Sequence, residues 1–286
     1  MKNELKKSLD WNPILKKLYV DNEIYTGKNA VVRNDTNKLI AVVGKDYEVF
    51  SNSQLMELSN SIAAKGQFEL LGYDELNEGK TILAFLKNTL PNLKINGCAT
   101  KEYLIIGTSH DGTRPLYIGT GSSLARCENQ FYSTIQILRQ KHNAPFNLND
   151  ISVKNIINSY NLRKGKIYDS FNSLENVRVD QSVIDKLIKD IHKTLSKDSK
   201  QLKPSELGKS PSMLLLQNSI QREMNDLGNN AFGLFNGVTW YTSHEMRNAG
   251  ADFGKINATA NIINQVAFKF CNNLKRAANN EIIVLR

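Results

Sequence analysis

The sequence has few cysteines and no long apolar run, and each absence excludes a class of protein. Its three cysteines, Cys98, Cys127 and Cys271, are far apart and form no CxxC pair. This usage is typical of reduced thiols in the cytoplasm and excludes a disulfide framework. No stretch approaches the roughly 18 consecutive apolar residues that a membrane-spanning helix needs, and no apolar segment of a signal peptide follows residues 1–10. We therefore expect a cytoplasmic protein without a membrane segment.

The familiar signatures of enzymes are absent as well. The sequence contains no GxxxxGK[ST] phosphate loop, no GxGxxG after a strand, no GxSxG elbow and no HExxH helix. A kinase or hydrolase of a familiar kind is thereby excluded, and no cofactor is expected. A shared metal site would need the fold to bring together histidines that lie tens of residues apart. These are His110, His142, His192 and His244.

The charge of the chain is moderately basic. Its 37 Lys and Arg residues exceed its 28 Asp and Glu residues, which gives a formal net charge of +9. Polyanions are the natural partners of such a surface, because each neutralised phosphate releases a condensed counterion. The charge alone is equally compatible with a basic protein that binds no nucleic acid.

Short runs of β-branched and aliphatic residues, bounded by turn residues, fill the first half of the sequence and predict strands. Between the second and third runs, Ser51 or Ser53 is a candidate N-cap of a helix that ends near Gly66. Residues 101–117 are expected to form a β-hairpin, because the pair Asp111 and Gly112 is a tight-turn signal. The predicted strands are residues 31–33, 39–43, 81–87, 102–107 and 116–119, the last continuing toward residue 126.

The apolar period changes after the predicted hairpin. From Glu128 the apolar positions recur at spacings of three and four, which predicts a helix over residues 128–141, before Pro145. Further helices are predicted over residues 182–197, with Ser182 as N-cap, over 213–227, closed by Gly228, and over about 257–278.

The sequence thus predicts an α+β fold. The first half is expected to hold an antiparallel sheet with a strand-strand-strand-helix core, and the second half to be mainly helical. We divide the chain into an α+β domain over residues 1–148 and a mainly helical region over residues 149–286. The loop at residues 204–211 is an alternative boundary.

Cations and aromatic residues occur together on the strand-strand-helix segment. Backbone phosphates bind Arg and Lys, and unpaired bases stack on aromatic faces for about 1 to 3 kcal/mol each. A solvated sheet edge with ordinary core aromatics remains the alternative. The candidate nucleic-acid-binding residues are Lys101, Tyr103, His110, Arg114, Tyr117, Arg126, Arg139 and Lys141.

Three further features each allow a functional and a structural interpretation. His110 and Asp111 on an exposed turn could bind a divalent metal or a phosphate, whereas in the structural interpretation Asp111 and Gly112 simply make the turn. Cys127 could be a thiolate at a helix N-terminus or a buried small residue. The aromatic run at residues 231–244, which contains Trp240, could be a docking surface or part of the core.

Several stretches together resemble the phage/plasmid-like protein family, a domain family of unknown function from mobile elements. They are Val42 to Val49, Ser109 to Gly112 after an apolar strand, Cys127 to Asn129 before Lys141 and His142, and Phe232 to Thr239 followed by His244. The likeness extends from about Val31 to Phe270. In the family pattern an arginine stands three residues before the cysteine, but here that position is Leu124, so Arg126 need not take its role. The resemblance implies a mobile-element setting and no established activity.

Three functions follow as hypotheses. The strand-strand-strand-helix order of residues 81–141 is similar to the core of RecT, Redβ and Erf-type annealing proteins, which implies ATP-independent binding or annealing of single-stranded DNA by a homo-oligomer. A metal-dependent nucleic-acid enzyme would instead use His110 and Asp111 with His142 or His244, although Mg²⁺ sites usually hold several carboxylates. The third hypothesis is a mobile-element protein that binds a host defence protein. The sequence favours a non-enzymatic protein.

Overall fold

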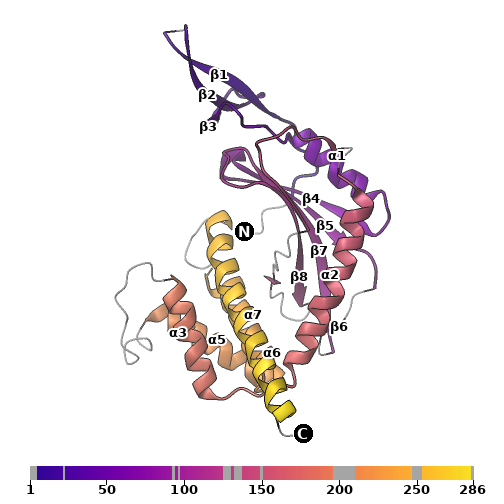
Figure 1. The fold of residues 1–286 in the computed structure, drawn as a ribbon, viewed down its shortest axis with the longest axis vertical. Coiled ribbons are helices and arrows are strands. Elements are labelled where there is room, and N and C mark those ends of the chain that lie inside the picture. The colour runs from indigo at the N-terminus through magenta and orange to yellow at the C-terminus, as the bar shows by residue number, and fades with distance from the viewer. Residues whose placement is uncertain are drawn as a thin grey trace. The chain divides into compact units, whose positions relative to one another are not determined.

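The structure, a computed structural model, divides the chain into two compact units (Figure 1). The first unit comprises Met1–Asn92, Lys101–Gly121 and Thr134–Arg163, and the second comprises Leu93–Thr100, Ser122–Ser133 and Lys164–Arg286. Strands dominate the first half of the chain and helices the second, which confirms the predicted α+β class. The residues described are 5–21, 23–91, 94–95, 97–124, 130–131, 137–148, 151–195, 210–246 and 253–284.

A three-stranded antiparallel sheet begins the first unit. It consists of β1 (Pro13–Val20), β2 (Ile24–Arg33) and β3 (Leu39–Gly44), in that order. The strands predicted at residues 31–33 and 39–43 lie in β2 and β3, whereas β1 was not predicted. In Figure 1 the β1–β2 hairpin extends beyond β3.

The second sheet runs in the order β10-β8-β7-β5-β4. The predicted hairpin is confirmed, because β7 and β8 are hydrogen-bonded neighbours joined by residues 110–115. Two short strands pair outside this order, β6 with β7 and β9 with β8. The elements are β4 (Phe68–Leu76), a short turn η1 (Asn77–Gly79), β5 (Thr81–Asn88), β6 (Lys94–Ile95), β7 (Cys98–Ser109), β8 (Leu116–Leu124), β9 (Gln130–Phe131) and β10 (Leu138–Gln140).

Helix α1 (Asn52–Ala63) packs its apolar side chains into the core of the first unit. Its N-terminus is the predicted one, because the Ser51 hydroxyl accepts from the Gln54 amide at 3.1 Å and the Gln54 side chain accepts from the Ser51 amide at 2.8 Å. Helix α2 (Val153–Leu174) adds Ile156 and Tyr160 to the same core, and Figure 1 shows both helices along one side of the large sheet. Among the core residues they meet are Leu86, Leu104, Ile106, Leu116 and Ile118.

The helix predicted over residues 128–141 is wrong. Residues 130–131 form β9 and residues 138–140 form β10, where Leu138 pairs with Ile118 of β8. An apolar spacing of three or four over a short segment does not distinguish a helix from a strand that pairs with a distant partner. In the predicted strand-strand-strand-helix order, the third strand is β8, and it is followed by the strands β9 and β10 instead of a helix.

The second unit is mainly helical. It holds the end of α2 together with α3 (Gln181–Leu195), α5 (Pro211–Leu227), α6 (Ala231–Trp240), a π-helical turn η3 (Tyr241–Glu245) and α7 (Phe253–Val284). As predicted, α5 ends at Gly228, whose φ of 98° suits glycine. Ser182 does not cap α3, because the Asp180 carboxylate accepts from the Val183 amide at 3.0 Å. Among the described residues, no helix is long and apolar enough to cross a membrane.

Candidate nucleic-acid interface

The two faces of β7 differ in burial. Leu104, Ile106 and Thr108 are fully buried on the side that belongs to the core of the first unit. On the other side Lys101 and Tyr103 are half-buried, whereas Ile105 and Ser109 are buried. The partly exposed part of this opposite face is therefore the place where the predicted binding residues of β7 can meet a ligand.

Tyr117 and Arg139 lie side by side on this open face. They pair across β8 and β10, so their Cβ atoms are about 5 Å apart. The Tyr117 ring covers Gly107 of β7, where a Cβ atom would lie 2.3 Å from the ring. Glycine at position 107 thus allows the tyrosine to lie flat over the neighbouring strand. Burial raises the pKa of the Tyr117 phenol, which the Arg114 side chain opposes by a hydrogen bond.

Further along the face, Tyr103 pairs with Lys87 of β5. Both side chains are half-buried. Tyr103 is four residues from Gly107, so the two tyrosines are about 13 Å apart along the strand direction. Lys87 was not among the predicted binding residues, because only the cross-strand register puts it beside Tyr103. The pairing of β5 with β7 thus adds a cation to the predicted set.

Acidic residues occupy the β4 side of the same face. Glu69 pairs with Lys87, and Asp74 pairs with Leu83. Burial raises the pKa of the Asp74 carboxyl, with the Lys6 ammonium opposing the shift. Lys101 and Arg139 lie on β7 and β10, away from β4, whereas Lys87 of β5 lies directly beside Glu69. The open sheet face is defined here by Lys87, Lys101, Tyr103, Tyr117 and Arg139.

The remaining predicted residues lie around the hairpin connection or outside the described residues. Arg114 is half-buried, and its backbone is held by the Ser109 hydroxyl, which accepts from the Arg114 amide at 2.8 Å. Lys141 is exposed directly after β10. Arg126 and Cys127 fall outside the residues that the structure describes.

The expectation that His110 lies exposed on a turn is wrong. The turn itself is as predicted, since the Asp111 carboxylate accepts from the Thr113 amide at 3.0 Å and Gly112 has a φ of 74°. However, the His110 side chain is fully buried and its Nε2 donates to Oδ1 of Asn52 at 2.8 Å. Burial lowers the pKa of His110 to about 3. The neutral ring fastens the hairpin connection to the start of α1, and its Nδ1 has no hydrogen-bond partner among the described residues.

His142 forms a second buried contact at the same place. Its Nδ1 donates to the Glu48 carbonyl at 2.7 Å, so its Nε2 accepts from the Thr108 hydroxyl at 3.3 Å. The Tyr47 ring stacks on it at 4.8 Å, and the Tyr47 hydroxyl donates to the Ser109 carbonyl at 2.8 Å. Burial lowers the pKa of His142. The two neutral histidines are thus structural members of the hairpin base.

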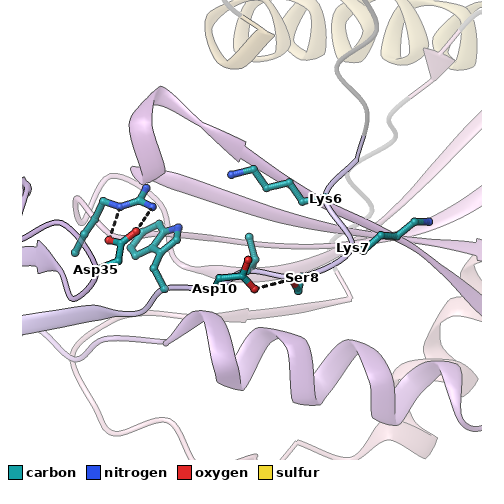
Figure 2. A pocket seen from close by; sticks show the side chains of 8 residues that line it. Lys6, Lys7, Ser8, Asp10 and Asp35 are labelled. Carbon is teal, nitrogen blue, oxygen red and sulfur yellow. Dashed lines mark hydrogen bonds and ion pairs between the residues drawn. The ribbon is translucent and has the colours of Figure 1, made fainter.

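Among the described residues, no group of three or more His, Cys, Asp or Glu side chains is placed to hold a metal ion. A pocket of about 450 Å³ lies at the N-terminal segment, and Figure 2 shows its lining. Its Arg33 stacks over Trp11 at 3.9 Å and binds Asp35 through two hydrogen bonds of 2.9 and 3.0 Å. Glu75 binds Arg33, Lys6 and the Trp11 indole. These paired charges stabilise the junction of β2 with β4.

The aromatic run at residues 231–244 belongs mainly to the core. Phe232, Leu234 and Phe235 are buried within α6, which confirms the core interpretation. At its end, Trp240 is half-exposed between the Arg222 guanidinium at 3.8 Å and the His244 ring at 3.9 Å. Both faces of the indole are therefore occupied.

A family model described as a domain of unknown function, DUF932, matches residues 39–278. The match begins at the first residue of β3 and ends within α7, so it includes every member of the open sheet face. Strands β1 and β2 precede it. No curated protein and no solved structure matches the chain.

Proposed function

The chain belongs to the DUF932 family, and we propose that this protein binds single-stranded DNA and anneals it without ATP. One observation carries the proposal. Two tyrosines and three cations, Lys87, Lys101 and Arg139, occupy one half-open face of an antiparallel sheet. Tyrosine rings stack on unpaired bases of any sequence, and cations bind the phosphates between them.

The chemistry of annealing suits a site of this kind. Base pairing itself supplies the free energy, so the protein needs only to hold strands extended with their bases accessible. The likeness to RecT, Redβ and Erf-type proteins does not support the proposal, because the helix of the predicted strand-strand-strand-helix order is replaced by β9 and β10. The setting in the proposal is a phage or plasmid within a bacterial cytoplasm, as the sequence resemblance implies.

A single copy offers few cations to one strand. Repetition of the face in a homo-oligomer would raise the local concentration of contacts along the same DNA without new chemistry. We include a homo-oligomer in the proposal for this reason. Light scattering of the purified protein, with and without a long oligonucleotide, measures the mass of the oligomer.

Fluorescence anisotropy with a labelled single-stranded oligonucleotide and its duplex tests DNA binding. We expect tighter binding to the single strand and an affinity that falls steeply as salt rises. The same titration with EDTA and an inspection of the DNA for cleavage separate binding from a metal-dependent nuclease. Failure to bind either DNA would reject the proposal and favour a protein partner.

A further inference from the structure

The outer face of the β1–β2–β3 sheet is apolar and exposed. Across this face Ile14 pairs with Val32, and Val32 pairs with Leu39. In the next row Ala30 pairs with both Lys16 and Val42. At the tip of the hairpin Val20 pairs with Ile24. The outer apolar face is defined here by Ile14, Val20, Ile24, Leu39 and Val42, which are 38%, 50%, 67%, 56% and 49% exposed.

The opposite face of this sheet has a different character. Val31 is fully buried in the core of the first unit. Toward the tip, the Lys17 ammonium lies 5.7 Å from the centre of the Tyr25 ring, and the Tyr25 hydroxyl donates to Asn29 at 3.1 Å. Lys17, Tyr25 and Asn29 thus contact one another on that face, where Leu15 and Tyr19 are nevertheless 38% and 48% exposed. On the outer apolar face Ala30 and Val32 are buried between the exposed side chains.

A soluble monomer rarely exposes an apolar patch larger than a few hundred Å². The five side chains, each more than a third exposed, form a patch of this kind. Two sheets can pack face to face about 10 Å apart with interdigitated side chains. The outer apolar face therefore has the shape for another sheet.

The charges of the hairpin favour a second copy of the same chain, although the Lys16 ammonium also donates to the Asn37 side chain at 3.0 Å. Lys16 and Lys28 lie midway along the hairpin, and Asp21 and Glu23 lie at its tip. When two copies pack about a two-fold axis with hairpins antiparallel, the tip of each lies beside the middle of the other. Val20, Ile24 and Val42 are then covered, whereas Ile14 and Leu39 lie beyond the partner's tip. The acids of one copy then meet the lysines of its partner, so the face is complementary to itself.

We propose that two copies of this chain pack through the outer apolar face, with antiparallel hairpins and with Asp21 and Glu23 of one copy beside Lys16 and Lys28 of the other. This contact specifies the first interface of the homo-oligomer in the proposed function. The contact requires no DNA, so the mass of the dimer can be measured in the absence of nucleic acid. Loss of the dimer and loss of DNA binding are therefore separate results.

Sedimentation velocity of the full chain over a range of micromolar concentrations tests the interface. We expect a dimer for the native chain, and at least a tenfold weaker dimer for Val42→Glu, because a charge would be buried against an apolar partner. Leu162→Glu is the matched control, since Leu162 is 64% exposed on α2, and it should leave the dimer unchanged. A monomeric native chain, or a Val42→Glu variant with the native mass, would overturn the proposal.

Ile24→Lys provides a second test if Val42→Glu fails to fold. Ile24 is at the tip and is the most exposed apolar residue of the face, so its replacement leaves the core of the first unit intact. Near-ultraviolet circular dichroism checks the fold of each variant. A folded Ile24→Lys variant that dimerises as tightly as the native chain counts against the interface.

A charge exchange tests the antiparallel arrangement. The double variant Lys16→Glu and Lys28→Glu should weaken the dimer, because four acids then meet at each end. Adding Asp21→Lys and Glu23→Lys to the same chain should restore it. Failure of this restoration would overturn the antiparallel arrangement.

Discussion

The two sheets of the first unit each have one partly open face, and these faces differ in chemistry. The open face of the large sheet carries tyrosines and cations in alternating rows, such as Tyr117 beside Arg139. The outer face of the small sheet carries aliphatic side chains such as Val42 and Leu39. Phosphates and bases require the first kind of surface, and another protein sheet requires the second. One unit can therefore offer DNA and a second copy of itself separate surfaces.

The largest expected effect comes from removing both tyrosine rings of the open sheet face. In the double variant Tyr103→Leu and Tyr117→Leu, apolar bulk remains but the stacking surface is lost. We expect single-stranded DNA to bind at least roughly 30-fold more weakly, because each stacked base contributes about 1 to 3 kcal/mol. Anisotropy titration measures the change, while the sedimentation coefficient without DNA should remain native.

Tyr19→Leu is the matched control for that double variant. Tyr19 is 48% exposed on β1, outside the open sheet face. Its replacement should leave DNA affinity unchanged. If Tyr19→Leu weakens DNA binding as much as the double variant does, the assignment of DNA binding to the open sheet face fails.

Local signals in the sequence predicted much of this fold. The alternating runs gave β5, β7 and β8, and Ser51 gave the start of α1, because each signal lies within a few residues. Strands β1 and β4 were missed. The first begins at Pro13, and the second contains Gly72 and a register shift, so neither alternates cleanly.

Features that depend on distant residues could not be read from the sequence. Leu138 lies in a strand because it pairs with Ile118, and a helix was predicted there instead. His110 is buried because Asn52, far away in the chain, accepts its hydrogen bond. Strand alternation was enough to assign Tyr103 to one face of β7, whereas Lys87 lies beside it only because of the register between β5 and β7.

The next largest expected effect is on the pH dependence of stability. It comes from the buried histidines that support the hairpin of the large sheet. The pKa of His110 is lowered to about 3 from its usual value near 6.5. A lowered histidine pKa means that its stabilisation is complete above pH 6.5 and is lost as the pH falls toward 3. Between pH 6 and 5 His110 should reduce the free energy of unfolding by about 1 kcal/mol per pH unit.

Urea unfolding at pH 7, 6 and 5 measures this slope for the native chain and for His110→Gln. Other titrating groups, Asp74 with its raised pKa among them, are present in both proteins, so the difference between the two slopes reports His110. His110→Gln should lose stability at pH 7 but show a shallower decline. An equal slope in both proteins would contradict the structural role of a neutral His110.

The smallest expected effect is that of one phosphate contact. Arg139 is exposed on β10 beside Tyr117, and Arg139→Ala removes one cation from the open sheet face. If Arg139 binds a phosphate, the slope of log affinity against log salt should fall by about 0.7, the value for one contact to a single strand. Lys65→Ala is the matched control, because Lys65 is exposed directly after α1, the helix that packs into the core of the first unit. Titrations at several salt concentrations give both slopes. Since both variants remove one positive charge, a general effect of net charge would change them equally, whereas a contact on the open sheet face changes only Arg139→Ala.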